Sequence, residues 1–295
     1  MKLIYRKRVL LAITQSFGGE LSATHFQKLL FLFTERQVKK NYDFVPYRFG
    51  CFSFQAMADK SRLMKDGFLE DVKNWKITSC DMNFASTLND LDRKELTKFR
   101  TKYHNFSTKE LIREIYLTYP YYAINSEIAE KYLDVKEGEA INKLKPNDVK
   151  TSLFTIGYEG RTLEIYLNLL IQNNIKVLCD VRKNPLSMKY GFSKKTLQNA
   201  CETLNIKYIH LPELGIESRK RQNLKTQCDY DSLFQDYEKT VLHQQIKAIT
   251  FIIDLLNNYN RVALTCFEYS PRRCHRTRVA NAVHSLDETI PLKHL

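Results

Sequence analysis

The second half of the chain alternates short apolar runs with amphipathic helical patterns, and this alternation constrains the fold more than any other feature. Apolar runs at 153–158, 175–182, 206–212 and 261–268 are each followed by a stretch with helical periodicity. Antiparallel strands can be joined by a two-residue turn, whereas parallel strands need a long crossover, usually a helix. The alternation therefore predicts an α/β domain: a parallel sheet with helices on both faces.

The first part of the chain has a different pattern, dominated by helices. Amphipathic segments cover 3–17, 23–37 and 54–67, and Ser22 is the expected N-cap of the second of them. The segment FLEDVKNWKITS, 68–79, alternates like a short β-hairpin. Three helices and a hairpin are the order of a winged helix-turn-helix, and an ordinary small helical domain with a hairpin cap fits the pattern equally well.

Helical periodicity continues over 84–134, where Ser107 or Thr108 can cap one helix and Ser126 can start another. Residues 134–152 are polar, lack aromatic side chains and contain Gly and Pro, so the domain linker is expected there. We therefore expect a winged-helix-like helical domain at 1–80, a helical connector and linker at 81–150, and an α/β catalytic domain at 151–295.

The charge of the chain favours a nucleic-acid partner. The sequence contains 46 Lys and Arg against 33 Asp and Glu, a net charge of +13, and residues 1–150 and 151–295 carry net charges of +7 and +6. Cationic side chains neutralise phosphates, and the 17 Tyr and 17 Phe offer ring faces on which bases can stack. We expect DNA as the partner; a generally basic protein without such a partner is the alternative.

Apolar segments and cysteines restrict the remaining classes. No stretch reaches the roughly 18 apolar residues of a membrane span, and the N-terminus lacks a small-residue cleavage site, so a cytoplasmic protein without a membrane partner is expected. The seven cysteines contain no C-x-x-C pair, which argues against a disulfide framework and a structural zinc site. The His and Cys residues show no convincing ligand set, so we expect neither a metal nor another cofactor. The oligomeric state does not follow from these patterns.

Polar residues follow each predicted strand. In open parallel sheets, ligands bind beyond the carboxyl ends of the strands. The four strand ends carry GYEGR (157–161), DVRKNPLS (180–187), HLPELG (210–215) and CFEYSPRRCHR (266–276). The sequence therefore predicts one site at this edge of the sheet.

These motifs also carry a resemblance to a known family. GYEG, DVRKNP followed by GFSKK, PELG, and CFE followed by CHR resemble, in this order and spacing, the bacterial domain of unknown function 488 over about residues 153–290. The resemblance implies an α/β domain, neighbourhood with DNA-processing or phage-defence genes, and a polar site that some members use as DNA glycosylases. In the first part, KLLFLFTERQ and YRFGCFSFQAMADKSRLMKDGFL are similar to helical modules of antitoxin and phage-associated proteins, which implies contact with DNA or a partner.

Two carboxylates are the first catalytic candidates. Asp180 ends the strand VLCD, and Arg182 lies two residues later on the same side of the extended chain, so the two side chains are expected to pair. Glu268 holds the equivalent place on the last strand. One acid can stabilise a cationic sugar while the other handles a proton. The alternative is a structural ion pair between Asp180 and Arg182, with Glu268 only neutralising Arg272 or Arg276.

A thiol is the second chemical option. Cys274 lies near the first turn of the final helix, where the helix dipole and neighbouring cations lower a thiol pKa. These cations are Arg272, Arg273, His275 and Arg276. Small size alone also explains this cysteine. Cys266 with Arg272 has the C-x5-R spacing of cysteine phosphatases, and the DVR strand end is similar to rhodaneses, but a carboxylate and a proline inside the loop oppose oxyanion binding.

Glycines and basic segments are candidates for substrate contacts. Gly157 and Gly160 flank a turn before a helix, where backbone N–H groups can hold phosphate, although a tight turn alone also requires glycine. Basic segments at 193–195, 218–222 and 271–273 are predicted to frame one groove. The residues expected to bind substrate or nucleic acid are Tyr158, Gly157, Lys194, Lys195, Arg219, Lys220, Arg221, Tyr269, Arg272, Arg273, His275 and Arg276.

These features lead to the hypothesis of a DNA glycosylase that removes a modified or damaged base, in a phage-defence setting. Basic segments would grip the backbone, a nucleotide would be flipped into the pocket at the strand ends, and a tyrosine would stack on it. Arg182 and Arg276 would hold phosphate or the leaving base. The alternatives are a thiol-dependent transferase or hydrolase that uses Cys274 or Cys266, and a non-catalytic DNA-binding regulator.

Overall fold

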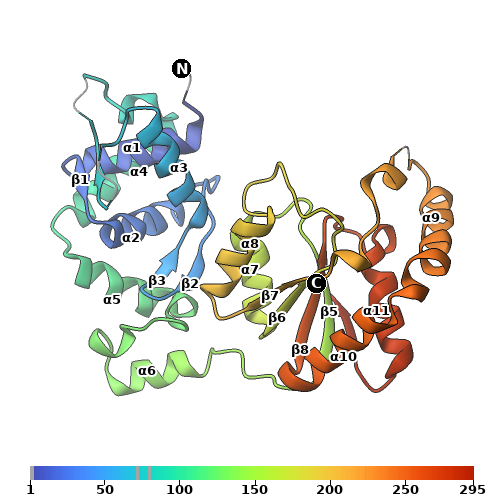
Figure 1. Cartoon of the computed structure of the whole chain (residues 1–295). Coiled ribbons are helices and arrows are strands. Elements are labelled where there is room, and N and C mark those ends of the chain that lie inside the picture. The colour runs from blue at the N-terminus through green and yellow to red at the C-terminus, as the bar shows by residue number, and fades with distance from the viewer. Residues whose placement is uncertain (1–2, 71–72, 79–80, 223) are drawn as a thin grey trace. The chain divides into compact units, whose positions relative to one another are not determined.

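The computed structural model describes residues 3–70, 73–78, 81–222 and 224–295. The chain divides into two compact units, 1–145 and 146–295, drawn in blue to green and in green to red in Figure 1. In the described ranges, every helix is too short or too polar to span a lipid bilayer. Each unit is described by itself below.

The first unit is mainly helical. Its α-helices are α1 (Tyr5–Ser16), α2 (Ala23–Thr34), α3 (Phe54–Lys65), α4 (Asp90–Tyr103), α5 (Thr108–Thr118) and α6 (Val135–Asn142), and its 3-10 turns are η1 (Ala85–Thr87), η2 (Pro120–Ala123) and η3 (Ala129–Lys131). Side-chain caps set where these helices begin: Ser22 accepts from the backbone N–H of His25, as predicted, and Ser107 forms a capping box with Glu110. Helix α2 is buried along most of its length and lies at the centre of the unit.

Two small antiparallel ladders complete the first unit. The strands are β1 (Glu20–Leu21), which pairs with β4 (Trp75–Lys76), and β2 (Val45–Tyr47), which pairs with β3 (Gly50–Phe52). A bridge joins Leu69 to Ile77, so the predicted hairpin forms in the part of 68–79 that the structure describes. Three helices with a hairpin wing confirm the winged-helix-like order; residues 71–72 and 79 of the predicted hairpin lie outside the described residues.

The segment before the second unit differs in part from the prediction. Ser126 does not start a helix: its hydroxyl accepts from the backbone N–H of Ile128 and hydrogen-bonds the Tyr116 hydroxyl, so this side chain is used in a turn. Helix α6 begins instead at Asp134, which caps it together with Glu137. The helix occupies the first half of the expected linker, and the unit boundary follows it. The three-part division at residues 80 and 150 stays a prediction.

The second unit is an α/β domain, as predicted. Its strands are β5 (Ser152–Gly157), β6 (Val177–Asp180), β7 (Lys207–His210), β8 (Arg261–Cys266) and β9 (Leu292–His294). They form a five-stranded parallel sheet in the order β7-β6-β8-β5-β9 within the described residues. The α-helices are α7 (Leu163–Gln172), α8 (Lys194–Glu202), α9 (Gln227–Thr240), α10 (Ile246–Tyr259) and α11 (His275–Leu286), and the 3-10 turns are η4 (Pro212–Leu214), η5 (Ser218–Arg221), η6 (Leu242–Gln244) and η7 (Pro271–Arg273).

Helices cover both faces of this sheet, with α7 and α8 on one side and α10 and α11 on the other (Figure 1). Strands β5, β6 and β8 are buried at every residue, as expected for a parallel sheet covered on both faces. Their side chains join those of α9, α10 and α11 in one apolar core, which includes Val177, Leu264, Ile252 and Val279. This core fixes the carboxyl ends of the three central strands at one edge of the sheet.

Candidate active site at the carboxyl ends of the strands

The strand register brings the predicted motifs together. Gly157 pairs with Cys266, and Asp180 pairs with Thr265. A pocket with a volume of about 440 Å³ lies at this edge. The residues that line it include Tyr158, Arg182, Lys183, Arg221, Cys266, Glu268 and His275. Of the four residues predicted to be catalytic, Arg182 and Glu268 line this pocket.

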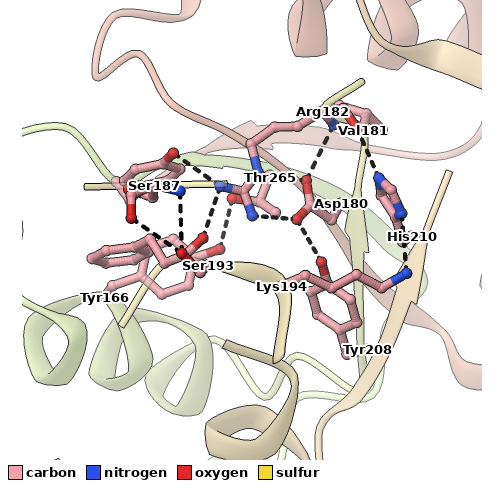
Figure 2. Close-up of polar contacts among 12 residues, drawn as sticks. Tyr166, Asp180, Val181, Arg182, Ser187, Ser193, Lys194, Tyr208, His210 and Thr265 are labelled. Carbon is pink, nitrogen blue, oxygen red and sulfur yellow. Dashed lines mark hydrogen bonds and ion pairs between the residues drawn. The ribbon is translucent and has the colours of Figure 1, made fainter. Parts of the chain in front are cut away.

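Asp180 and Arg182 form the expected pair, and Figure 2 shows how completely the carboxylate is used. Its Oδ1 accepts from the backbone N–H of Arg182 at 3.1 Å and from Nε at 2.8 Å. Its Oδ2 accepts from Nη2 of Arg182 and, at 2.6 Å, from the Tyr208 hydroxyl. A carboxylate has about four acceptor positions, so the buried Asp180 has no oxygen left for a substrate. Its expected catalytic role is not supported, because it holds Arg182 in place.

Arg182 is a fixed cation at the wall of the pocket. Burial acts to lower its pKa, but the neighbouring Asp180 raises the pKa well above the ordinary value. Its Nη1 donates to the Tyr158 hydroxyl and to the Phe192 carbonyl, both at 2.9 Å. The Tyr158 ring is buried and stacks on Phe192, with centroids 4.3 Å apart and planes 7° apart. One face of Tyr158 is therefore occupied, which disfavours the expected stacking of a base on this ring.

Lys194 contacts His210 at the end of β7, and His210 contacts the backbone of Arg182. Lys194 Nζ lies 3.3 Å from Nδ1 of His210, and Nε2 of His210 lies 2.9 Å from the Arg182 carbonyl oxygen (Figure 2). A lysine ammonium only donates, so Nδ1 accepts and the Nε2–H donates to the carbonyl. Lys194, expected to bind nucleic acid, thus contacts the end of β7.

Cys266 and His275 form a buried contact at the base of the pocket. The Sγ of Cys266 lies 3.6 Å from Nδ1 of His275, and Nε2 of His275 lies 2.9 Å from the Val181 carbonyl oxygen. Burial acts to raise the pKa of the Cys266 thiol, but the hydrogen bond from Cys274 and the charges of His275 and Arg221 hold this pKa well below its ordinary value. Burial and the Cys266 thiolate raise the pKa of Cys274. The lowered thiol pKa predicted for Cys274 therefore belongs to Cys266.

Glu268 lies at the pocket with a partner that sequence reasoning did not identify. One carboxylate oxygen forms an ion pair with Nη2 of Arg221, and the other lies 3.4 Å from Cys266 Sγ. The Glu268 side chain is 12% exposed, and its partner comes from η5, far along the chain. Neither Arg272 nor Arg276 neutralises it. Glu268 is thus a carboxylate that faces the pocket beside a cation.

Arg276 holds the loop between β8 and α11. It is fully buried, and its two terminal nitrogens donate to the backbone carbonyls of Glu268 and Tyr269. These contacts use the guanidinium within the protein, so the expected contact of Arg276 with phosphate or a leaving base is not supported. Arg276 instead fixes the backbone that carries Glu268.

Gly157 allows that loop to approach the sheet. A Cβ atom at Gly157 would lie 1.8 Å from the backbone oxygen of Glu268. The N–H groups of Tyr158 and Glu159 both donate to the Phe267 carbonyl, at 3.1 and 2.8 Å. These amides are not available to an anion, so the predicted phosphate cradle at Gly157 does not form. The glycine is needed for close packing of two strand ends.

The remaining predicted contacts lie on the surface. Arg219 pairs with Glu217 at 2.6 Å, and Lys220 pairs with Asp236 at 3.1 Å, both with little burial. Tyr269 is 59% exposed, and the Arg161 guanidinium lies 5.0 Å from its ring centroid. Lys195, Arg272 and Arg273 are exposed. Of the two tyrosines proposed to stack on a base, Tyr269 is the accessible one.

Sequence reasoning missed one grouping at this site. The ligand atoms of Cys266, Cys274 and His275 all lie within 4.8 Å of one another. The His and Cys residues were expected to lack a metal-ligand set, because the sequence contains no C-x-x-C pair. Tyr208 was missed as well, although the alternation of KYIH could have pointed its side chain to one face of the strand.

Comparison with known proteins supports the resemblance of the second unit. Residues 162–283 match the family model described as Domain of unknown function DUF488, and the pocket residues from Arg182 to His275 lie within this range. The predicted resemblance is confirmed there. The comparisons with curated proteins and with solved structures found no match. The resemblance of the first unit to antitoxin and phage-associated modules stays a prediction.

Proposed function

We propose that the second unit is a hydrolase that acts on DNA and cleaves the N-glycosidic bond of a modified or damaged base. One observation carries the proposal: among the residues that line the 440 Å³ pocket, Glu268 is the carboxylate, and it pairs with Arg221. Hydrolysis of a glycosidic bond passes through a cationic sugar, which a carboxylate stabilises. A role in phage defence and a cytoplasmic location belong to this proposal.

Glu268 is placed for one acid–base step. In the hydrolysis, the bond between the base nitrogen and sugar C1′ breaks, and a water oxygen bonds to C1′. The base leaves with the electron pair and gains a proton, while Glu268 accepts the proton of the attacking water. Arg221 holds one oxygen of Glu268, and the other oxygen, which lies 3.4 Å from Cys266 Sγ, would take this proton.

The pocket suits a single nucleotide taken out of the duplex. Its volume of about 440 Å³ lies within the range of roughly 300 to 1,000 Å³ that is usual for ligand sites. Arg221, which is partly exposed at the pocket, can donate to a phosphate or to a base edge; the buried Arg182 already donates to Asp180, Tyr158 and Phe192. Phe267, which lines the pocket, and Tyr269, two residues later, are exposed aromatic rings on which a base can stack.

The charge of the chain and the fold of the first unit support DNA as the substrate. The net charge of +13 favours a polyanion. A winged-helix-like order of helices, as in the first unit, is common among DNA-binding modules. In this proposal the basic surface binds the backbone, and the pocket receives one nucleotide.

The direct test is formation of abasic sites. We expect the full chain, incubated with damaged or phage-type modified DNA and then treated with alkali, to produce strand breaks. Glu268→Gln should lose this activity by at least roughly 100-fold, the usual contribution of acid–base catalysis, and should still bind DNA. Glu202→Gln, an exposed change on α8, is the matched control and should remain active. Retained binding without breaks on any substrate would favour the regulator instead.

A second candidate is a thiol enzyme, favoured by the distance of 3.6 Å between Sγ of Cys266 and Nδ1 of His275. A thiol next to an imidazole is the usual arrangement of a cysteine nucleophile. Such an enzyme forms a covalent adduct on Cys266 during turnover. Mass spectrometry of the acid-quenched reaction distinguishes the two, because the glycosylase proposal predicts an unmodified Cys266.

A further inference from the structure

We infer that Cys266, Cys274 and His275 bind a divalent metal ion of the zinc class, with a fourth coordination position that faces the pocket beside Glu268. Cys266 ends β8, Cys274 precedes α11, and His275 is the first residue of α11. Their ligand atoms lie within 4.8 Å of one another, and all three side chains are buried. Within the described residues, this is the group of His, Cys, Asp and Glu side chains that could hold a metal ion.

The spacing of the ligand atoms fits a tetrahedral ion. Zinc bonds sulfur at about 2.3 Å and nitrogen at about 2.0 Å, so tetrahedral angles put a sulfur and a nitrogen ligand roughly 3.6 Å apart. Cys266 Sγ and His275 Nδ1 are separated by 3.6 Å. The two side chains therefore need little movement to share one ion.

The other nitrogen of His275 is held as in a metal-bound histidine. Its Nε2 lies 2.9 Å from the Val181 carbonyl oxygen, which only accepts, so Nε2 carries the proton. In the neutral form of the ring that binds a metal, the lone pair of Nδ1 points toward Cys266. A backbone carbonyl or a carboxylate in this role is the usual outer partner of a metal-ligating histidine.

Clustering with a histidine distinguishes Cys266 and Cys274 from the other cysteines that the structure describes. Cys179 lies in the apolar core and Cys228 is exposed, as expected for small structural or surface residues. Two thiolates and a neutral imidazole would carry a charge of about −2, which one divalent ion balances in a buried site. The donor types select a borderline-soft ion such as zinc over magnesium or calcium.

The fourth position gives the ion a chemical role, and this step rests on the proposed function. Cys266 and His275 line the pocket together with Glu268. Three protein ligands and one open position are typical of catalytic zinc, which lowers the pKa of a bound water to about 7. Zinc held by one His and two Cys beside a non-ligand Glu also activates water in enzymes that deaminate nucleobases. Here Glu268 would take the proton of the bound water.

The experiment measures metal directly on the full chain. We expect elemental analysis of the purified protein to find about one zinc per chain, the stoichiometry of a single tetrahedral site. After removal of zinc by a chelator, added Co²⁺ should produce a thiolate-to-cobalt charge-transfer band and the visible bands of tetrahedral cobalt. Cys274→Ala should abolish both, and circular dichroism shows whether this variant is folded. Cys228→Ala, which removes an exposed cysteine, is the matched control and should keep both.

A measurement on the unaltered protein decides the case if Cys274→Ala fails to fold. A thiol reagent is added to the zinc-loaded and to the chelator-treated chain. Two more thiols should react after the metal is removed, because two cysteines are the expected ligands. Equal modification in both states, together with no cobalt spectrum, would overturn the metal site.

The metal site and the proposed function fail in different ways. If no metal binds but abasic sites still form, the metal inference is wrong and the glycosylase proposal stands. If cobalt binds through Cys266, Cys274 and His275 but no DNA is cleaved in the loaded protein, the metal site stands and the glycosylase proposal fails.

Discussion

At the residue scale, Asp180 is the group on which the position of Arg182 depends. Asp180→Asn removes the counter-charge of a buried guanidinium that has 6% side-chain exposure. Loss of one partner from a buried ion pair costs about 3–5 kcal/mol. We therefore expect the second unit of this variant to unfold at a clearly lower urea concentration, measured by circular dichroism.

Tyr208→Phe is the matched control for this change. It removes one hydrogen bond to the same carboxylate and leaves the ion pair intact, so a loss of about 1 kcal/mol is expected. Equal stability of Asp180→Asn and the unaltered protein would contradict the role assigned to Asp180.

Gly157 provides a second prediction at this scale. A methyl group there would overlap the Glu268 carbonyl, at 1.8 Å, and both the strand end and the loop are held by backbone hydrogen bonds. Gly157→Ala should destabilise the second unit by about 3 kcal/mol or more, since overpacking costs 1–3 kcal/mol even where atoms can move. The measurement is urea unfolding followed by circular dichroism.

The matched control for Gly157→Ala is Gly160→Ala in the same turn. Gly160 has a φ of +74° and open space around its Cα, so only backbone strain of about 1–2 kcal/mol is expected. If both variants cost the same, close contact with the loop is not the reason for glycine at 157.

The two carboxylates show what sequence position can and cannot assign. Asp180 ends one buried strand and Glu268 follows another, and these positions predicted that both lie at one edge of the sheet. Their roles depend on partners from elsewhere: Tyr208 from the neighbouring strand and Arg221 from η5. A linear pattern does not reveal such partners. The sequence therefore could not show that the oxygens of Asp180 are fully hydrogen-bonded within the protein, whereas Glu268 lines the pocket.

At the scale of elements, the loop between β8 and α11 depends on Arg276. Two carbonyls of this loop accept from one planar guanidinium. Lysine cannot reproduce this fork, so Arg276→Lys should release the backbone at Glu268. We expect about a tenfold or greater loss of the rate of abasic-site formation, because misplacement by about 1 Å can cost 100-fold.

Arg278→Lys is the control on the same helix, because Arg278 pairs with Glu238 at 3.5 Å near the surface. This variant should keep the full rate. A folded Arg276→Lys protein with normal activity would show that the loop does not need this support.

The elements themselves were predictable where periodicity is strong. Strands β5, β6, β7 and β8 coincide with the four predicted apolar runs. Turn residues mark the ends of the helices between them. Strand β9 was missed because its three residues, LKH, are partly exposed at the edge and carry no strand pattern. Ser126 was assigned to a cap because serine favours helix starts, yet a contact with Tyr116 from α5 fixes it in a turn.

At the scale of the whole molecule, the hydrophobic patterning predicted two kinds of domain but not the chemistry of the pocket. The change from helical to alternating patterns separates a helical part from an α/β part. The grouping of Cys266 with Cys274 and His275 depends on the start of α11 turning back toward the end of β8. Such a return of the chain is a tertiary feature, so the separation of seven residues between the cysteines did not identify it.

The division into two units predicts two separate unfolding transitions. Each unit has its own compact core, and domains with separate cores usually unfold as separate cooperative units. The chain contains one tryptophan, Trp75, which is buried and stacks on Phe26 with ring centroids 3.6 Å apart. Tryptophan fluorescence therefore reports the first unit alone, whereas circular dichroism reports both.

In urea, Asp180→Asn and removal of metal by a chelator should shift only the transition seen by circular dichroism and leave the fluorescence midpoint unchanged. A ligand that binds only the folded state stabilises it, by roughly 4 kcal/mol at a thousandfold excess over its dissociation constant, so the chelator effect should be large if zinc binds at Cys266. The matched change in the first unit is Ser107→Ala, which removes an N-cap worth about 1 kcal/mol and should shift the fluorescence transition alone. If Asp180→Asn also shifts the fluorescence midpoint, the two cores unfold together. Trp75 lies in the first unit and Asp180 in the second, so separate unfolding would leave that midpoint unchanged.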